Sequence, residues 1–211
     1  PYREDGMKNF MKFTAVLASV LLLSQAVAAE RKVVIPPDSA KKKLMRIVTV
    51  SAEGADFADP VAAVNSITDA SESNPYLVSI GPGVYTLPGT LVMKPFVTIV
   101  GAGREATTLT GAISTFSYDA SSALVAGADN ATLLDLTIAN TGGGSVAIGL
   151  YNDGASPVLQ DVTVTATGGR FNYGVYNEYS SSPEMIDVSA KGTGGNYNYG
   201  VFNSSAPRKR E

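Results

Sequence analysis

The chain reads ATLLDLTIANTGGGSVAIGLYN at residues 131–152, SPVLQDVTVTATGGRFNYGVYN at 156–177 and SPEMIDVSAKGTGGNYNYGVFN at 182–203. The three copies share an aspartate, found at Asp135, Asp161 and Asp187. The subtractions 161 − 135 and 187 − 161 both give 26. A fixed period of this length is typical of a solenoid, in which each repeat buries its apolar face only by stacking on its neighbours. The region from Ala131 to Asn203 therefore predicts coils of 26 residues.

The composition of the 211 residues excludes several kinds of chemistry. With 45% hydrophobic residues, the chain can build a substantial core. It contains no Cys and no His, which excludes disulfides, thiolate metal sites, Cys nucleophiles and imidazole acids, bases or ligands. Any catalysis would have to use Asp, Glu, Lys, Arg, Tyr, Ser or Thr.

Charge is distributed unevenly along the chain. Between Thr49 and Pro207 there are four basic residues and fourteen acidic ones, and 4 − 14 gives −10. The four basic residues are Lys94, Arg104, Arg170 and Lys191. Because nucleic-acid binding depends on neutralising phosphates, we expect no nucleic-acid partner. The same charge should repel polyanionic polysaccharides unless a divalent cation bridges the two.

Residues 1–29 have the pattern of a secretory signal peptide with a few residues upstream of it. Lys8 and Lys12 precede the apolar run TAVLASVLLLSQAVAA, and cleavage is predicted after Ala28 or Ala29. The start site would then be Met7 or Met11. The alternative is a membrane anchor or a buried helix, but the run is short for the ~20 apolar residues that span a bilayer. We therefore expect a secreted, periplasmic or cell-surface protein with no membrane span in the mature chain.

The remaining chain divides into an exposed lead-in at 30–46, a β-solenoid at 47–207 and a basic tail at 208–211. Within the solenoid, Asp59 followed by Pro60 is a helix start signal and predicts a helix over about 60–70. An amphipathic helix in this place would cap the open end of the core.

Short apolar runs separated by Gly and Pro fill residues 76–111. They read YLVSI, GPGVYTL, TLVM, FVTIVGAG and TTLTG, and they predict strands of solenoid coils because hairpin signals are scarce. Residues 112–130 are expected to form an irregular coil or a protruding loop.

The first coils also carry a family resemblance. The runs SAEGADFADPVAAVNSI, IGPGVYTL and VTIVGAGREATTLTG resemble the opening of the pectin-lyase-like right-handed parallel β-helix superfamily, and the pectinesterase-type members in particular. The matching positions are Gly54, Phe57, Pro82, Gly83, Tyr85, Gly101, Gly103 and Gly111. The resemblance covers about 50–111. It implies an all-β, right-handed parallel β-helix with an N-terminal capping helix.

The resemblance does not extend to the catalytic motifs of these families. Pectinesterases carry G-x-V-D-F-I-F-G with a second Asp, an Arg and paired glutamines, and this sequence holds no such stretch. Polygalacturonases require a histidine, and pectate lyases use an Arg-rich pattern beside calcium, whereas Arg170 is the only Arg between Arg104 and Arg208. No catalytic residue is therefore predicted.

The repeated aspartates Asp135, Asp161 and Asp187 would form a ladder, because equivalent residues of stacked coils lie about 4.8 Å apart. By alternation, the neighbouring Leu136 and Ile138 should point inward and the aspartates outward. Two interpretations remain for the ladder. It could be a solvated stripe that prevents sheets from sticking together, or a calcium site in which one ion bridges two neighbouring carboxylates.

Asparagine and aromatic residues repeat at the end of each copy. Asn152, Asn177 and Asn203 are predicted to form a structural ladder at a turn, where Asn tolerates left-handed backbone. Tyr151, Tyr176 and Phe202 should lie on the outer face beside a glycine track formed by Gly149, Gly174 and Gly200. Such a stripe could stack against a polysaccharide or cell-surface glycan. Alternatively, the rings stack on one another or fill the core.

The pattern stops soon after Asn203, where another strand is expected. An uncapped solenoid end exposes core and strand edges, so we predict a chain truncated at its C-terminus or one that self-associates end to end at its last coil.

Three functions are consistent with these observations. The first is a secreted, non-catalytic module with a carbohydrate-binding or structural role. The second is a carbohydrate esterase or polysaccharide lyase whose active coils lie outside this sequence. The third is an adhesin or autotransporter stalk.

Overall fold

The structure, a computed structural model, describes residues 45–204. The predicted signal peptide at 1–29, the lead-in up to residue 44 and the basic tail at 208–211 lie outside the described residues. Met45 begins the described chain, and the first strand follows at Arg46.

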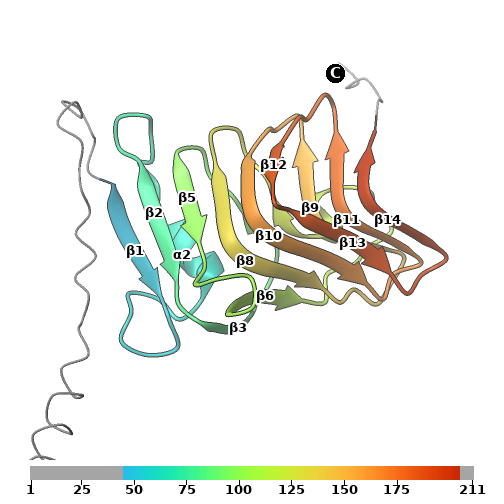
Figure 1. Ribbon diagram of the computed structural model, residues 1–211, viewed down its shortest axis with the longest axis horizontal. Helices are drawn as coiled ribbons and strands as arrows, with labels where there is room; N and C mark the ends of the chain where they lie inside the picture. The colour runs from blue at the N-terminus through green and yellow to red at the C-terminus, as the bar shows by residue number, and fades with distance from the viewer. Residues whose placement is uncertain (1–44, 205–211) are drawn as a thin grey trace, which may run out of the picture. The chain divides into compact units, whose positions relative to one another are not determined.

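The described residues form a parallel β-solenoid, as the repeat predicted (Figure 1). Its elements are β1 (Arg46–Val50), α2 (Pro60–Ser66), β2 (Tyr76–Ile80), β3 (Gly83–Thr86), β4 (Leu91–Val92), β5 (Val97–Val100), β6 (Thr107–Gly111), η1 (Ala120–Ser122), β7 (Ala123–Ala126), β8 (Thr132–Asn140), β9 (Val146–Asp153), β10 (Val158–Thr167), β11 (Phe171–Glu178), β12 (Glu184–Ile186), β13 (Ser189–Thr193) and β14 (Tyr197–Asn203).

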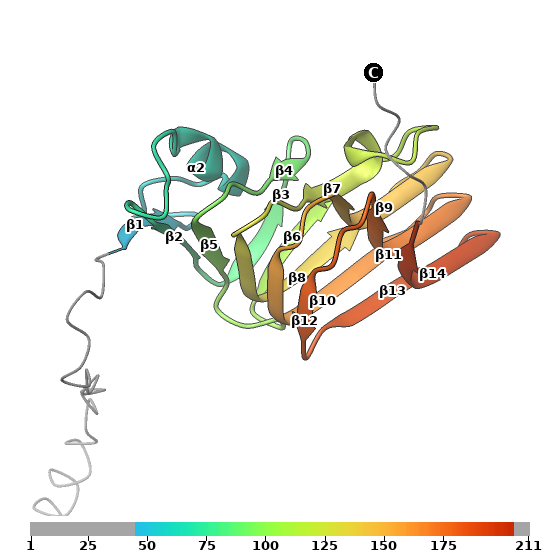
Figure 2. The same ribbon diagram turned by 90° about the horizontal axis from the view of Figure 1, so that it is seen from above.

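The strands stack into three faces, and every pairing between the named strands is parallel. The first face follows the order β1-β2-β5-β8-β10-β12. The second contains β3, β6, β13 and the later halves of β8 and β10. The third has the order β4-β7-β9-β11-β14 and lies opposite the long bent strands in Figure 2.

The coil length varies by one residue. On the first face, Val158 pairs with Thr132 and Glu184 with Val158, so both steps are 26 residues. On the third face Phe171 pairs with Val146, a step of 25. One residue more separates Asp135 from Tyr151 (151 − 135 = 16) than separates Asp161 from Tyr176 (176 − 161 = 15). The glycine-rich segment 141–145 between β8 and β9 lies in the longer interval.

The bend between the first and second faces falls on the aspartate ladder. Asp135, Asp161 and Asp187 have φ angles of 54°, 53° and 51°. Asp is one of the few residues other than Gly that adopt this left-handed conformation readily. The prediction that the asparagines occupy the left-handed positions was therefore wrong, because Asn152, Asn177 and Asn203 lie within strands.

The core lies between the three faces. Leu136 and Ile138 are fully buried, as are their equivalents Val162 and Val164 in the next coil, which confirms the predicted inward set. In the last described coil, Val188 and Ala190 are partly buried against the same cluster. Each coil thus supplies one layer of aliphatic side chains.

The helix α2 ends at Ser66, earlier than the predicted residue 70. Its start is as predicted, since the Asp59 carboxylate accepts a hydrogen bond from the Val61 amide at 2.9 Å and Pro60 occupies the first turn. At its other end Lys94 Nζ donates to the carbonyl of Ile67 at 2.6 Å. Val64 and Ile67 join the main core beside β1 and β2. The capping role of the helix stays a prediction.

The strands predicted within 76–111 are present, but β7 was not anticipated, because it lies inside the stretch expected to be irregular. The rest of that stretch, residues 112–122, is anchored by the buried Asn140. Its Oδ1 accepts from the Ile113 amide at 3.0 Å, and its Nδ2 donates to the Ile113 and Ile148 carbonyls, both at 2.8 Å. This segment is thereby held beside the third face.

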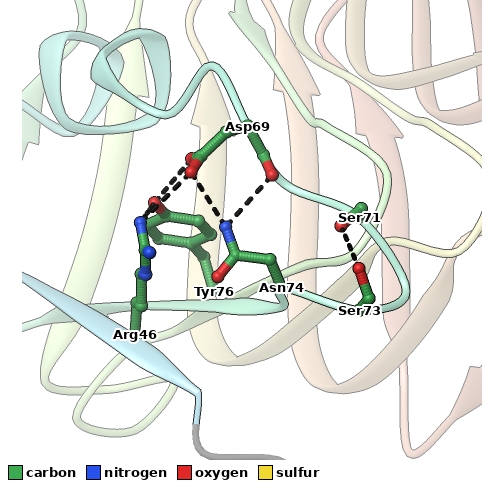
Figure 3. A network of polar contacts seen from close by, with 6 residues as sticks. All are labelled: Arg46, Asp69, Ser71, Ser73, Asn74 and Tyr76. Carbon is green, nitrogen blue, oxygen red and sulfur yellow. Dashed lines mark hydrogen bonds and ion pairs between the residues drawn. The ribbon is translucent and has the colours of Figure 1, made fainter.

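A polar network connects β1 to the segment between α2 and β2 (Figure 3). Arg46 Nη1 donates to Asp69 Oδ2 at 3.1 Å and to the Tyr76 hydroxyl at 2.9 Å. The Tyr76 hydroxyl donates in turn to Asp69 Oδ1 at 2.6 Å, and Asn74 Nδ2 donates to Asp69 Oδ2 at 3.0 Å. The network lowers the pKa of Asp69, mainly through the Tyr76 hydrogen bond.

Candidate carbohydrate-binding face

The outer surface of the third face carries a cluster of side chains separate from the main core. Leu150 and Val175 point into the main core, whereas Tyr151 and Tyr176 belong to the second cluster together with Tyr173. Adjacent residues thus lie on opposite sides of the sheet, as the alternation predicted.

The aromatic rings are less exposed than an open binding stripe requires. Tyr151 is only 4% exposed and Tyr176 only 6%, while Phe202 is partly buried. The ring centroids of Tyr151 and Tyr176 are 5.7 Å apart, and those of Tyr176 and Phe202 are 5.1 Å apart. The rings therefore stack on one another, which was the alternative interpretation. Their exposure was predicted wrongly for Tyr151 and Tyr176, and sugar binding by the three rings stays a prediction.

The expected glycine track is not part of the outer surface. A Cβ atom on Gly149 would lie 2.5 Å from Val164 Cγ1, and one on Gly174 would lie 2.6 Å from the Lys191 amide nitrogen. Val164 and Lys191 belong to β10 and β13 across the core. Glycine is needed here because the two sides of the solenoid approach each other closely.

Two further aromatic pairs extend the outer cluster, and they were not predicted. Phe171 and Tyr197 stack with centroids 4.6 Å apart and rings 6° from parallel. Tyr173 and Tyr199 stack at 5.0 Å with the same angle. The signal was present in the alternation F-N-Y and Y-N-Y, in which the rings are two residues apart and share one face of the strand.

The segment 112–122 covers part of this cluster through Tyr118. Its ring centroid lies 5.8 Å from that of Phe171, 6.0 Å from Tyr173 and 6.3 Å from Tyr176. Tyr118 itself is 40% exposed, and Phe116 at the tip of the segment is 89% exposed. The cover explains why the middle rings are buried although they lie on the outside of the sheet.

A pocket of about 280 Å³ lies where this segment meets the third face. It is lined by Asp119, Ala120, Ser121, Ala126, Gly127, Tyr151 and Asp153. The Tyr151 hydroxyl donates to Glu178 Oε2 at 2.6 Å. Burial, reinforced by this carboxylate, holds the pKa of Tyr151 well above its ordinary value, so the hydroxyl keeps its proton. The pocket thus combines an aromatic side chain, a serine and carboxylates.

Two amide ladders run through the coils on the inner side of the third face. Asn152 Nδ2 donates to Asn177 Oδ1 at 2.7 Å, and Asn177 Nδ2 donates to Asn203 Oδ1 at 2.8 Å. The first two side chains are buried, so this predicted coil-to-coil ladder is confirmed. The second ladder, from Asn172 Nδ2 to Asn198 Oδ1 at 3.0 Å, was not predicted. Both ladders serve the structure, because their amides are bonded to each other.

The aspartate ladder carries an arginine against its middle member. Arg104 Nη2 lies 2.9 Å from Asp161 Oδ1 and also donates to the carbonyl oxygen of Asp187 at 2.7 Å. Within residues 45–204 no group of three or more acidic residues is arranged to hold a metal ion. The role of Asp135, Asp161 and Asp187 in calcium binding therefore stays a prediction, and their observed role is to form the bend.

Across the part of the chain that the structure describes, no helix is both long and apolar enough to cross a bilayer.

Comparison with known proteins gave matches in structure only. No protein-family model and no curated protein sequence matches this chain. A pectin methylesterase mutant in complex with a hexasaccharide is similar with a TM-score of 0.55 and 18% identity. The match covers 71% of this chain and 50% of that protein. Pectin methylesterase PemA from Erwinia chrysanthemi matches with a TM-score of 0.48, 16% identity and coverages of 72% and 53%.

The pectin methylesterase from carrot matches with a TM-score of 0.49 and 18% identity over 69% of this chain and 49% of that protein. The present chain thus spans about half the length of the structures that it matches. At these identities the similarity establishes the fold, and it agrees with the motifs found in the first coils. The chain therefore has the right-handed parallel β-helix fold of the pectin-lyase-like proteins.

Proposed function

We propose that this chain is a non-catalytic β-helix module that binds a neutral polysaccharide or cell-surface glycan on the outer side of its third face. The observation that carries the proposal is the aromatic cluster of that face together with the adjoining pocket beside Tyr151. The module would act outside the cytoplasm, in keeping with the signal-peptide pattern of residues 1–29.

The accessible rings lie in the last described coil. Tyr197 is 45% exposed and Tyr199 is 37% exposed, although each stacks on a ring of the preceding coil. A ring supported from below in this way loses little conformational freedom on binding, and a planar aromatic face is the usual partner of the apolar face of a sugar. These two rings are the best placed to stack against a glycan.

The charge of the face favours an uncharged ligand. Asp119 and Asp153 line the pocket and Glu178 lies behind Tyr151, whereas the pocket lining contains no Lys or Arg. Carboxylates would repel a uronate-rich chain but can accept hydrogen bonds from sugar hydroxyls. The 280 Å³ pocket is at the lower end of the usual range for small-ligand sites.

Binding can be tested by titrating neutral and uronate-rich oligosaccharides against the protein and three variants. Tyr199→Ala should weaken binding about tenfold, since stacking on one aromatic ring contributes about 1 kcal/mol. The matched control is Phe116→Ala, which removes a more exposed ring that is not part of the cluster, and Asp153→Asn tests the pocket. Unchanged affinity of Tyr199→Ala, or a preference for uronate-rich ligands, would reject the proposed face.

A second candidate function is a carbohydrate esterase or polysaccharide lyase with catalytic coils outside this sequence. The observation that favours it is the structural similarity to a pectin methylesterase over half of that protein's length. Ester release from methylated pectin by this chain, or by a longer form of it, would support the enzyme over the binding module.

A further inference from the structure

The last described coil exposes the positions that earlier coils bury. Leu159, Val162 and Val175 are each 0% exposed in the preceding coil. Their equivalents are Met185, Val188 and Val201, of which Met185 is 39% and Val201 41% exposed, while Val188 is partly buried. The layer that seals each coil is therefore incomplete at this end.

The strand edges of this coil are also unpaired within the described residues. β12 and β13 pair with β10 only, and β14 is the terminal strand of its sheet, pairing with β11. All three faces thus end at the same level and present free backbone groups. Edges of this kind recruit further strands unless they are covered.

The opposite end of the solenoid does not match this surface. There, β1 and β2 extend the first face alone, while the second and third faces begin later, at β3 and β4. The helix α2 lies at that end, and its exposed residues are Ala62, Asn65 and Ser66 (Figure 2). A small, polar surface on an incomplete coil cannot complete the apolar layer of a three-sided coil.

We propose that the last coil is the interface of a symmetric dimer, in which it packs against the last coil of a second copy. A twofold axis perpendicular to the solenoid would pass through the bend at Asp187 and Val188 and leave through the middle of β14. It would exchange the two flanking strands, so that β12 of one copy lies beside β13 of the other, and β14 lies antiparallel to its equivalent. Such an interface is isologous and closed, which limits assembly to two copies.

The charges of the coil are complementary in this arrangement. An axis between Asp187 and Val188 places opposite each other those residues whose numbers add to 375, as 187 + 188 does. Glu184 then faces Lys191 of the second copy, because 184 + 191 is also 375, and Met185 faces Ala190. The preceding coil has the uncharged Val158 and Thr165 at the positions of Glu184 and Lys191. The last coil thus carries an opposite-charge pair that a twofold axis would join twice.

The first test measures the molar mass of the full chain by size-exclusion chromatography with light scattering over a range of concentrations. We expect a dimer, which Val201→Asp should dissociate with at least a tenfold rise in the dissociation constant. The matched control is Val84→Asp, at a valine that is 73% exposed and lies on β3, away from the last coil. A monomer at all concentrations, or assemblies that grow beyond two copies, would refute the proposal.

The second test uses the absence of cysteine from the chain. Glu184→Cys and Lys191→Cys are made separately and mixed under mild oxidation. The mixture should form a disulfide-linked heterodimer, whereas each variant alone should form much less cross-linked product, because like positions are apart. The thermal unfolding of each variant checks that it is folded. Equal cross-linking in all samples, or none in the mixture of folded variants, would show that the axis is misplaced.

Discussion

Arg104 and Asp161 are 57 residues apart in the sequence, and their side chains form an ion pair of 2.9 Å on the outside of the solenoid. The same Nη2 atom donates to the carbonyl oxygen of Asp187 at 2.7 Å. The segment between β5 and β6 thereby contacts the bends of two later coils. One side chain thus connects three levels of the stack.

Replacement of Arg104 by Ala should reduce the stability of the solenoid modestly. Both groups are about one third exposed, so we expect a loss of about 1 kcal/mol in the free energy of unfolding from the ion pair and the carbonyl contact together. Urea denaturation measures the change. Glu105→Ala, at the exposed neighbouring residue, is the control and should stay within about 0.5 kcal/mol of the parent protein.

The asparagine ladder should be more sensitive to substitution. Asn177 is 3% exposed and bonds to Asn152 on one side and Asn203 on the other. Asn177→Ala leaves the buried Asn152 amide without its acceptor, which should cost about 2–3 kcal/mol. Asn196→Ala, at an exposed position of the last turn, should be nearly neutral in the same denaturation experiment. Equal effects of the two substitutions would contradict a structural role for the ladder.

The inward glycines should not tolerate a methyl group. A Cβ on Gly174 would lie 2.6 Å from the Gly200 carbonyl oxygen and from the Lys191 amide nitrogen, and both are backbone atoms that cannot rotate away. Gly174→Ala should therefore destabilise the protein by about 1–3 kcal/mol or more. Gly89→Ala is the matched control, because no atom lies within 4 Å of the position that its methyl group would take. The thermal unfolding midpoints of the two variants give the comparison.

The network in Figure 3 predicts a loss of stability in acid. The Tyr76 hydrogen bond, followed by the charge of Arg46, lowers the pKa of Asp69 below its ordinary value of 3.8. A lowered pKa in the folded state stabilises the fold above the unfolded pKa, and this contribution is lost as the pH falls through the folded value. We therefore expect the contribution to be constant near neutrality and to disappear below about pH 4.

Tyr76→Phe separates this effect from general acid sensitivity. Without the hydroxyl, the pKa of Asp69 should rise toward 3.8, which carboxyl chemical shifts in an NMR titration would record directly. Asp56 is the internal control, since its pKa is lowered by hydrogen bonds from Thr49 and should not change in this variant. A parallel change at both carboxylates would point to a general loss of structure instead.

The fold was predictable because the repeat determines it. Alternation within LLDLTI places Leu136 and Ile138 inward, and the Asp59-Pro60 pair marks the start of a helix from local chemistry alone. The left-handed bend was assigned to the wrong residues because Asn and Asp both adopt that conformation, and only the stacked backbone distinguishes them. The helix ended early because its last turn depends on packing and on Lys94, which lies far away in the sequence.

The candidate site was less predictable, since it depends on contacts between distant segments. The repeat correctly placed Tyr151 and Tyr176 on the outer side of the sheet, but their burial depends on Tyr118 and the segment 112–122. That segment is held by Asn140 and Ser122, whose hydrogen bonds leave no periodic signal. The one-residue variation in coil length was likewise hidden, because aligning the copies by their aspartates imposes a single step.

The register of the coils also determines how the protein would respond to a pulling force. Between β8 and β14, each residue pairs with one located 25 or 26 positions away, so no pairing spans more than one coil. Under tension applied at the chain ends, the coils would peel off one after another rather than rupture together. Each released coil would lengthen the chain by about 80–90 Å of contour, which gives the protein the mechanical behaviour of an extensible tether.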